Sequence, residues 1–427
     1  MLPILDLRLD PDAFTRFLTR DDHATADALD KVRTILEAVR AEGDAALRRY
    51  TLAFDGCAID ELRVSPEEIN AAWEVQPRGI QDALRHAAAR ISWYHEHQRP
   101  ADRVLDADGV AITERVLPVA RAGLYAPGGR ASYPSTVLMT AIPAAVAGVG
   151  ERVLCVPPGP DGAIAASTLA AAHVAEVETV VRVGGAQAIA AMAFGTESVP
   201  AAEVIVGPGN RYVTLAKQLV SGLVHIESMA GPSEVAIIAD ATAPPEYVAY
   251  DLCAQAEHGP AGTSVVVTWS DQLAAGVMAA LETIVAGSVR GEAIMESLTR
   301  GGAIVRVADC DEALRVVDSL APEHLEVMCV DARAVAQRVR NAGAIFVGNV
   351  APAALGDYAV GTNHVLPTGR AARYASALRV EDFVKHTHIV EVTHDGIAAL
   401  APTVVALAEL EGLHAHAQSV RARLGDQ

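Results

Sequence analysis

The amino-acid sequence predicts an α/β fold in which helices cover two parallel sheets. From Arg152 onward, short runs of β-branched residues alternate with alanine-rich helical stretches, a pattern typical of right-handed βαβ units. The runs form two consecutive series, which favours two sheet domains facing each other across a cleft. Of the 427 residues, 51% are hydrophobic and 4% are aromatic, so the chain can bury a large aliphatic core.

The expected elements begin with helices. The first hundred residues are charged and predict helices over Thr25–Tyr50 and Pro66–Gln98. From about Glu381 the pattern is mixed and then helical over Pro402–Arg423, and we expect this tail to be an arm that packs on a partner subunit. Strands are expected over Arg152–Val156, Thr179–Val183, Glu203–Val206 and Glu234–Ile238 in the first series, and over Ser264–Thr268, Ala303–Val307, Leu325–Cys329 and Ala344–Val347 in the second.

Composition limits the class of partner and the compartment. The chain has 34 Lys and Arg residues against 53 Asp and Glu residues, and this net charge of -19 argues against nucleic acid or an anionic membrane as a partner. Its five scattered cysteines form no C-x-x-C motif, which favours a reducing compartment. The first residues do not resemble a signal peptide, and the apolar run 137–149 is too short to span a bilayer. We therefore expect a soluble, cytoplasmic protein.

One expected helix carries a candidate metal face. It covers Pro244–His258, begins at Pro-Pro-Glu and stops before Gly259-Pro260. Gln255 and His258 share one side of its last turn, where free carbonyl groups favour a nearby cation. An amide oxygen and a neutral imidazole could supply half of a metal site, although glutamine is an unusual zinc ligand. The alternative is an exposed helix end with two polar residues, so the pair needs support from elsewhere in the chain.

Three glycine-rich loops lie where a parallel sheet usually binds ligands, and two of them directly follow predicted strands. Glycine lets the backbone approach a phosphate, and a helix N-terminus favours the anion. No G-x-G-x-x-G motif stands in this context, so the usual dinucleotide fingerprint is absent. Each loop alone could be a tight turn, but three in one sheet favour a nucleotide-sized ligand. The loops are Gly123-Leu-Tyr125-Ala-Pro-Gly-Gly129, Gly184-Gly-Ala-Gln187 and Gly207-Pro-Gly-Asn210.

Carboxylates stand next to imidazoles in the second half of the chain. Glu323 and His324 lie at a predicted helix-to-strand junction and point to different sides of an extended chain, so they could serve two separate proton transfers. The alternative is a loop with solvated charges. By contrast, Cys155 and Cys253 have weak claims as nucleophiles. Further acidic and histidine residues stand in a glycine-rich loop (Asp357 and His364) and in the tail (Glu411, His414 and His416).

Taken together, these motifs resemble the histidinol dehydrogenase family over about 33–424. The similarity rests on eight segments that occur in the family's order. In the stretch Ile226-Glu-Ser-Met-Ala230, which runs into one of them, the family usually has an Asp and often a Pro. The segments are the three glycine loops, Ala230-Gly-Pro-Ser-Glu234, Gln255-Ala-Glu-His-Gly-Pro260, Pro322-Glu-His-Leu-Glu326, Gly361-Thr-Asn-His-Val-Leu-Pro-Thr368 and Glu411-Gly-Leu-His-Ala-His416.

The resemblance implies a fold and a domain division. Family members have two incomplete Rossmann-like domains, similar to those of aldehyde dehydrogenases, with small terminal segments that embrace a neighbouring subunit. Residues 21–122 and 235–378 would form the domain on the zinc and substrate side, and 123–234 the domain on the NAD side. Residues 1–20 would be an N-terminal segment, and 379–427 the C-terminal dimerisation arm.

The resemblance also implies site residues, each by its match to a family motif. One Zn²⁺ per subunit would be held by four ligands. One of these, His416, would come from the partner subunit, so that a homodimer shares each active site. Glu323 and His324 would be catalytic. The zinc ligands would be Gln255, His258, Asp357 and His416; the NAD contacts Tyr125, Gln187 and Asn210; and the substrate contacts Ser233, His324, His364, Glu411 and the zinc ligands.

The implied reaction oxidises L-histidinol through L-histidinaldehyde to L-histidine. His324 would remove the alcohol proton while hydride passes to NAD, and Glu323 would activate water that adds to the aldehyde before a second hydride transfer. Two alternatives stay open at this point. One is a related zinc and NAD dehydrogenase that acts on a sulfonated diol. The other is a non-catalytic nucleotide-binding protein that has kept the scaffold.

Overall fold

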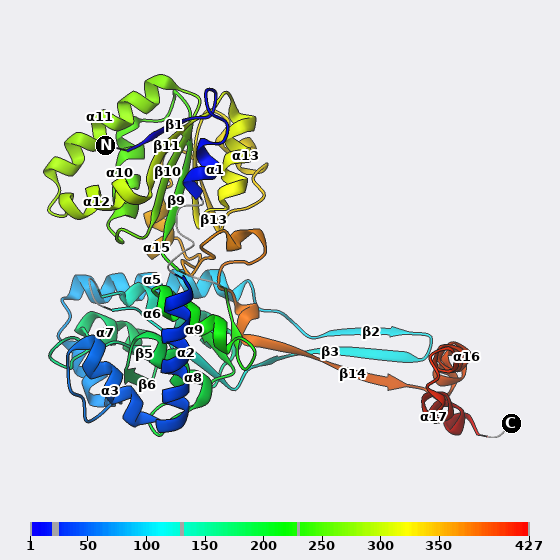
Figure 1. The fold of residues 1–427 in the computed structure, drawn as a ribbon. Coiled ribbons are helices and arrows are strands. Elements are labelled where there is room, and N and C mark those ends of the chain that lie inside the picture. Colours follow the sequence, from blue (N-terminus) through cyan, green and yellow to red (C-terminus); the bar gives the residue numbers. More distant parts are fainter. Residues whose placement is uncertain (1, 19–24, 129–131, 229–230, 426–427) are drawn as a thin grey trace. The chain divides into compact units, whose positions relative to one another are not determined.

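The structure, a computed structural model, describes residues 2–18, 25–128, 132–228 and 231–425, so Gly129 and Ala230 of the predicted motifs lie outside it. The chain divides into two compact units (Figure 1). Residues 1–98 and 120–383 form the first, and residues 99–119 and 384–427 form the second. The first unit contains two parallel sheets, which confirms the predicted fold class.

The smaller sheet of the first unit has five parallel strands in the order β6-β5-β4-β7-β8. The predicted strands at 152–156, 179–183 and 203–206 are confirmed within one residue at either end, whereas β4 and β8 were not expected. Four helices follow strands of this sheet. The elements are β4 (Arg121–Tyr125), α6 (Pro134–Ala147), β5 (Glu151–Val156), α7 (Ala166–Val174), β6 (Thr179–Arg182), α8 (Gly185–Phe194), β7 (Val204–Val206), α9 (Arg211–Val220) and β8 (His225–Ile226).

Helices from the N-terminal region complete this half of the unit. Helix α2 (Thr25–Glu42) places an apolar stripe with Val32 and Val39 in the same core as Ile189 of α8 and Val213 of α9. Helix α3 (Asp44–Asp55) joins that core, and α4 (Pro66–Glu74) and α5 (Arg78–Glu96) pack against α7 and α6. This packing differs from the expected grouping of 21–122 with 235–378, because the stripes of α2 and α3 bury against the smaller sheet.

Two helices predicted as continuous are interrupted. The first breaks at Gly43, whose positive φ of 56° suits glycine and ends α2. The second breaks at Pro77, which lacks an N–H to continue a helix and serves as the N-cap of α5. In both places local backbone chemistry divides a helical hydrophobic pattern that runs through the break.

The larger sheet has six parallel strands in the order β1-β11-β10-β9-β12-β13. Its strands alternate between two cores, with Val235 and Ile237 facing one and Ala236 and Ile238 the other. The strand β1, from the expected N-terminal segment, forms its edge. The elements are β1 (Ile4–Asp6), α1 (Ala13–Leu18), β9 (Glu234–Ala239), α10 (Pro245–Ala256), β10 (Thr263–Thr268), α11 (Asp271–Gly287), α12 (Gly291–Gly301), β11 (Gly302–Arg306), α13 (Cys310–Leu320), β12 (His324–Met328), α14 (Ala332–Ala336), β13 (Ala344–Val347) and α15 (Ala353–Tyr358).

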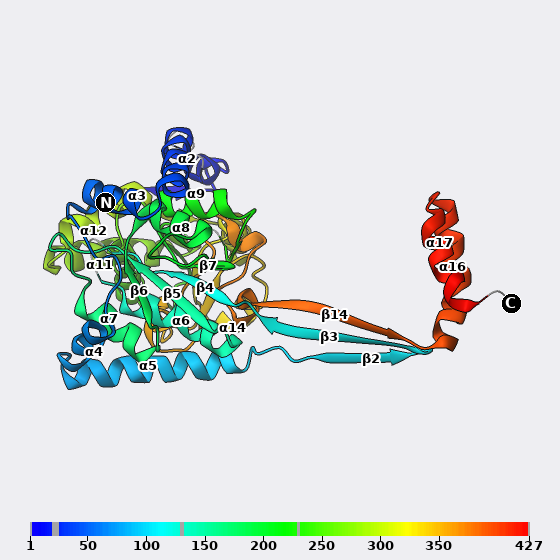
Figure 2. The ribbon, with the colours of Figure 1, turned by 90° about the horizontal axis from the view of Figure 1, so that it is seen from below.

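The second unit joins two segments that are far apart in the sequence. The strands β2 (Arg103–Ala107) and β3 (Val110–Pro118) form a hairpin, and β14 (Val384–Val392) pairs antiparallel with β3 (Figure 2). Both turn residues, Asp108 and Gly109, have positive φ, as a tight two-residue hairpin requires. The tail then forms α16 (His394–Leu410) and α17 (His414–Leu424), so its helical part begins earlier than the predicted Pro402.

No helix in the described part of the chain is long and apolar enough to cross a membrane. The predicted cytoplasmic location stays a prediction.

Candidate active site

A cluster of buried charged groups lies at the amino ends of β9 and β12. The two strands are parallel neighbours, and their register sets His324 opposite Val235. Glu323, which precedes β12, accepts hydrogen bonds at Oε2 from the Ser233 hydroxyl (2.5 Å) and from the backbone N–H of Glu234 (2.8 Å). The predicted junction between α13 and β12 is confirmed. The register of the two strands therefore brings two distant motifs into contact.

His324 is buried and contacts three oxygen atoms. Its Nδ1 lies 3.2 Å from the Glu234 carbonyl oxygen and 3.4 Å from Glu323 Oε2, while its Nε2 lies 3.5 Å from Asp357 Oδ1. Burial lowers the pKa of His324, but the Glu323 charge and the contact with Asp357 more than offset it, so the pKa is raised well above its usual value. Because a carbonyl oxygen only accepts, Nδ1 carries a proton, and Nε2 is the nitrogen that can exchange one.

Asp357 lies among imidazole rings. Burial raises its pKa, but His324, His364 and His258 together hold that pKa below the usual value. His364 is itself fixed at both ring nitrogens, since Nδ1 donates to the Asp357 carbonyl (3.0 Å) and Nε2 lies 3.1 Å from Thr136 Oγ1. Burial lowers the pKa of His364, which favours the neutral ring. Asp357 lies in helix α15 rather than in the glycine-rich loop that we expected.

Gln255 is buried in the last turn of α10, which ends at Ala256 rather than at the predicted His258. Its Oε1 lies 3.4 Å from Ser233 Oγ, and its Nε2 has no hydrogen-bond partner among the described residues. His258 follows the helix, with Nδ1 3.3 Å from the Gln255 carbonyl oxygen. Within the described ranges, no three His, Cys, Asp or Glu side chains form a metal-binding group. The ligands that this unit could offer are one amide, one imidazole and one carboxylate.

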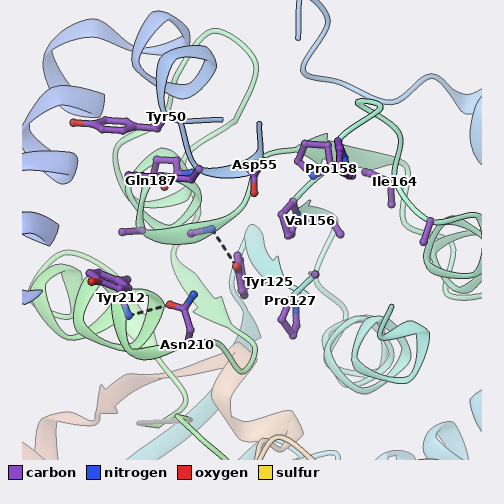
Figure 3. A pocket seen from close by; sticks show the side chains of 18 of the residues that line it. Tyr50, Asp55, Tyr125, Pro127, Val156, Pro158, Ile164, Gln187, Asn210 and Tyr212 are labelled. Atoms are coloured by element: carbon purple, nitrogen blue, oxygen red, sulfur yellow. Dashed lines mark hydrogen bonds between the residues drawn. The ribbon is translucent and has the colours of Figure 1, made fainter. Parts of the chain in front are cut away.

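A second feature of the first unit is a cavity of about 1620 Å³ at the carboxyl ends of the strands of the smaller sheet (Figure 3). Tyr125, Gln187 and Asn210, which the resemblance names as NAD contacts, all line it. The Tyr125 hydroxyl accepts a hydrogen bond from the N–H of Gly185 (3.1 Å), at the start of α8. Asn210 caps α9, because its Oδ1 accepts from the N–H groups of the next turn, including that of Tyr212 (2.9 Å).

A buried ion pair holds one loop of this cavity. Lys217 Nζ donates to Glu227 Oε1 (2.7 Å) and to the carbonyl oxygen of Gly207 (3.1 Å), while the N–H of Gly207 donates to the same Glu227 oxygen (2.7 Å). Gly207 has a φ of 126°, and a Cβ there would meet the carbonyl oxygen of Tyr125. The sequence marked Glu227 only as a departure from a family motif and gave no sign of Lys217, because a pairing across ten residues of loop and helix has no local pattern.

Glu411 and His416 lie in the second unit. Glu411 follows α16 as its C-cap, His416 lies in the first turn of α17, and both side chains are exposed. Cys155 and Cys253 in the first unit are buried, and burial raises the pKa of the Cys253 thiol to about 11. Neither cysteine therefore has the environment of a nucleophile, as predicted.

Comparison with known proteins covers nearly the whole chain. A family model described as Histidinol dehydrogenase matches residues 18–424. The chain is 51% identical over 399 residues to histidinol dehydrogenase from Parasynechococcus marenigrum (93% of this chain, 91% of the relative), and 48% identical over 401 residues to that of Methanothermobacter thermautotrophicus (94% of each). It is also similar to the crystal structure of histidinol dehydrogenase from Elizabethkingia anophelis, with a TM-score of 0.93, 34% identity, and coverage of 99% of this chain and 98% of the other. The chain belongs to the histidinol dehydrogenase family, whose members are oxidoreductases of histidine biosynthesis.

Proposed function

We propose that this protein oxidises L-histidinol through L-histidinaldehyde to L-histidine, with NAD as hydride acceptor and with one Zn²⁺ in each active site. The observation that carries the proposal is the contact of Glu323 and His324 with Ser233, Glu234 and Asp357. Two proton-transfer groups of different type, fixed side by side, suit an oxidation in two steps.

The residues present fit a zinc ion at Gln255. Ser233 has a single hydroxyl hydrogen, and the 2.5 Å contact with the acceptor-only Glu323 uses it. The 3.4 Å contact between Ser233 Oγ and Gln255 Oε1 would then join two acceptors, and Gln255 Nε2 would stay unsatisfied. A half-turn of the amide makes Nε2 the donor to Ser233 and leaves Oε1 free as a ligand. His258 and Asp357 would supply the next two ligands, and His416 of the partner subunit the fourth.

Zinc, when bound, would hold the imidazole and amine of the substrate and polarise its alcohol. His324 acts on the alcohol proton. Its Nδ1–H is held by the Glu234 carbonyl, so the ring orientation is fixed, and Nε2, once it has given up its own proton, is the atom that receives the alcohol proton. His364, with its neutral ring, and Ser233 would line the substrate beside it.

Glu323 acts in the second half of the reaction. Ser233 and the N–H of Glu234 both bind its Oε2, which leaves Oε1 to take a proton from the water that adds to the aldehyde. NAD, when bound in the cavity at Tyr125, Gln187 and Asn210, would accept the hydride in each step. The buried Oε1 of Gln187, a residue that lines this cavity, has no partner among the described residues.

The direct test supplies L-histidinol and NAD to the purified protein. We expect about two NADH for each histidine formed, from the two hydride transfers in the proposed reaction. Dialysis against a chelator should abolish the activity, and added zinc should restore it. Oxidation of a sulfonated diol in place of histidinol would overturn the proposed substrate, and undiminished activity after complete metal removal would overturn the proposed role of zinc.

We also propose a homodimer that shares each active site. Support comes from the second unit, where Leu410 is 83% exposed, Leu105 68% and Val104 66%, an apolar surface that a partner would cover. Neither His258→Ala nor His416→Ala should be active alone, whereas mixed dimers of the two variants should recover activity at one site. Labelled subunits would confirm exchange. Exchange without recovery would contradict the shared site.

A further inference from the structure

An aspartate in the wall of the large cavity has an unused acceptor. Asp55 is the last residue of α3, and Figure 3 shows it in the cavity wall, near Tyr125. Its Oδ2 is buried and has no hydrogen-bond partner among the described residues. By contrast Asp161, another cavity carboxylate, accepts a hydrogen bond from the N–H of Ala163 (3.1 Å). Asp55 is therefore a carboxylate of the cavity wall that the described residues leave with one unpartnered oxygen.

Asp55 has no ion-pair partner among the described residues, although Lys31 lines the same cavity. Burial raises its pKa to about 6, and no cation offsets the effect. A carboxyl oxygen that is buried without a donor costs stability, so a protein keeps one where a ligand supplies the donor. The occupant opposite Asp55 must therefore bring hydrogen-bond donors and cannot bring a phosphate.

NAD offers three kinds of donor: the nicotinamide amide, the adenine amino group and the ribose hydroxyls. Only a ribose has two neighbouring hydroxyls that can bind one carboxylate together, and acidic residues read ribose in this way in other dinucleotide sites. Asp55 lies on α3, which packs against α2 and α8, whereas the catalytic cluster lies on β9, β12 and α15. The ribose farther from the reacting atoms, that of the adenosine half, is therefore the one that Asp55 meets.

We propose that Asp55 accepts hydrogen bonds from the adenosine ribose hydroxyls of NAD, and that its carboxylate excludes NADP by repelling the 2′-phosphate. This inference rests on the proposed function, since it assigns a residue to the proposed cofactor. It extends the cofactor contacts beyond Tyr125, Gln187 and Asn210.

The test measures dissociation constants of NAD, NADP, ADP-ribose and NMN by calorimetry, on the full-length protein without substrate. The unmodified protein should bind NAD at least about tenfold more tightly than NADP. Asp55→Asn should weaken NAD and ADP-ribose about tenfold or more, as expected for the loss of charged hydrogen bonds. The substitution should leave the dissociation constant of NMN unchanged. The variant should also lose most of the preference of the unmodified protein for NAD over NADP.

Asp60→Asn is the matched control, because Asp60 is exposed and does not line the cavity. It should leave all four constants unchanged. Thermal unfolding without ligand checks that Asp55→Asn is folded, and Asp55→Ser serves in its place if it is not. Unchanged binding of NAD and ADP-ribose by the folded variant would overturn the assignment of Asp55 alone. Failure of the unmodified protein to bind either dinucleotide would overturn the proposed cofactor as well.

Discussion

The catalytic cluster and the large cavity satisfy their buried polar groups in different ways. At the amino ends of β9 and β12, Glu323 and His324 have partners in Ser233, Glu234 and Asp357. In the cavity, Gln187 Oε1 and Asp55 Oδ2 are buried without partners among the described residues. The bonds of Glu323 and His324 hold these two proton-transfer groups in place before substrate arrives, although Glu234 Oε2 and Gln255 Nε2 beside them also have no partner among the described residues. A cavity with vacant acceptors gains its hydrogen bonds only when a ligand enters.

The sharpest way to break this comparison is to remove the proton acceptor of the cluster. His324→Asn should reduce oxidation of histidinol by about four orders of magnitude, the upper range for a general base. Oxidation of supplied histidinaldehyde should fall much less, because the alcohol proton is no longer involved. Rates with both substrates, measured at saturating NAD, would decide this. An equal loss with both substrates would mean that His324 serves binding or structure instead.

Breaking the ion pair that holds the cavity loop should have the next largest effect. Glu227→Gln leaves Lys217 buried without its counter-charge, which should cost about 3–5 kcal/mol of unfolding free energy. Because Glu227 also holds the N–H of Gly207, NAD affinity should fall while zinc binding is retained. Denaturant unfolding and NAD titration test both expectations. The exposed pair Glu296 and Arg300 provides the control, since Glu296→Gln should change stability by less than about 1 kcal/mol.

A change at Glu323 separates the two halves of the reaction. Glu323→Gln keeps the shape but cannot accept a proton, so oxidation of supplied aldehyde should fall about a hundredfold. The first hydride transfer should persist, and stopped-flow measurement should show NADH formed once per site before a slow phase. If aldehyde oxidation proceeds at the unmodified rate, Glu323 is not the base for the water. Wild-type turnover of both substrates by both the Glu323 and His324 variants would refute both assigned roles.

The smallest expected effect concerns the pH dependence of stability. Burial, together with the Glu323 charge, raises the pKa of Glu234 to about 8. Its folded pKa exceeds the unfolded value, so the folded state holds an extra proton, and stability should fall as pH rises from about 5 to 8. Glu234→Gln should remove most of that fall, because the substituted side chain takes up no proton on folding. Denaturant unfolding of the metal-free protein at pH 5 and pH 8 measures this change in unfolding free energy. The same change in the unmodified protein and in Glu234→Gln would contradict the prediction.

The elements of the fold were largely predictable because they depend on local patterns. All eight expected strands agree with the structure within one residue at either end, although Glu234–Ile238, expected in the first series, belongs to the larger sheet with the second series. The strand β4 was missed because Gly123, which lies in its middle, was assigned to a glycine-rich loop. Helix ends were less predictable where Gly43 or Pro77 interrupts an apolar stripe that continues on both sides.

The candidate site was predictable as a set of residues but not as a geometry. The motifs named Glu323, His324 and Asp357, and the structure brings these three together. The motifs alone do not show that Ser233 and the N–H of Glu234 bind Glu323. That contact depends on the register of two strands that lie about ninety residues apart in the sequence. The unused acceptor of Asp55 had no sequence signal, since only the cavity around it makes it unusual.

The sequence by itself determined the alternation of strands and helices, the two parallel sheets and the residues able to carry the chemistry. These follow from hydrophobic period, turn residues and side-chain type, all of which act over a few positions. The tertiary structure alone decided that α2 and α3 pack on the smaller sheet, that β1 completes the larger one, and that residues 99–119 pair with the tail. Such pairings depend on which apolar faces and strand edges fit one another across the whole chain, and no local pattern records that choice.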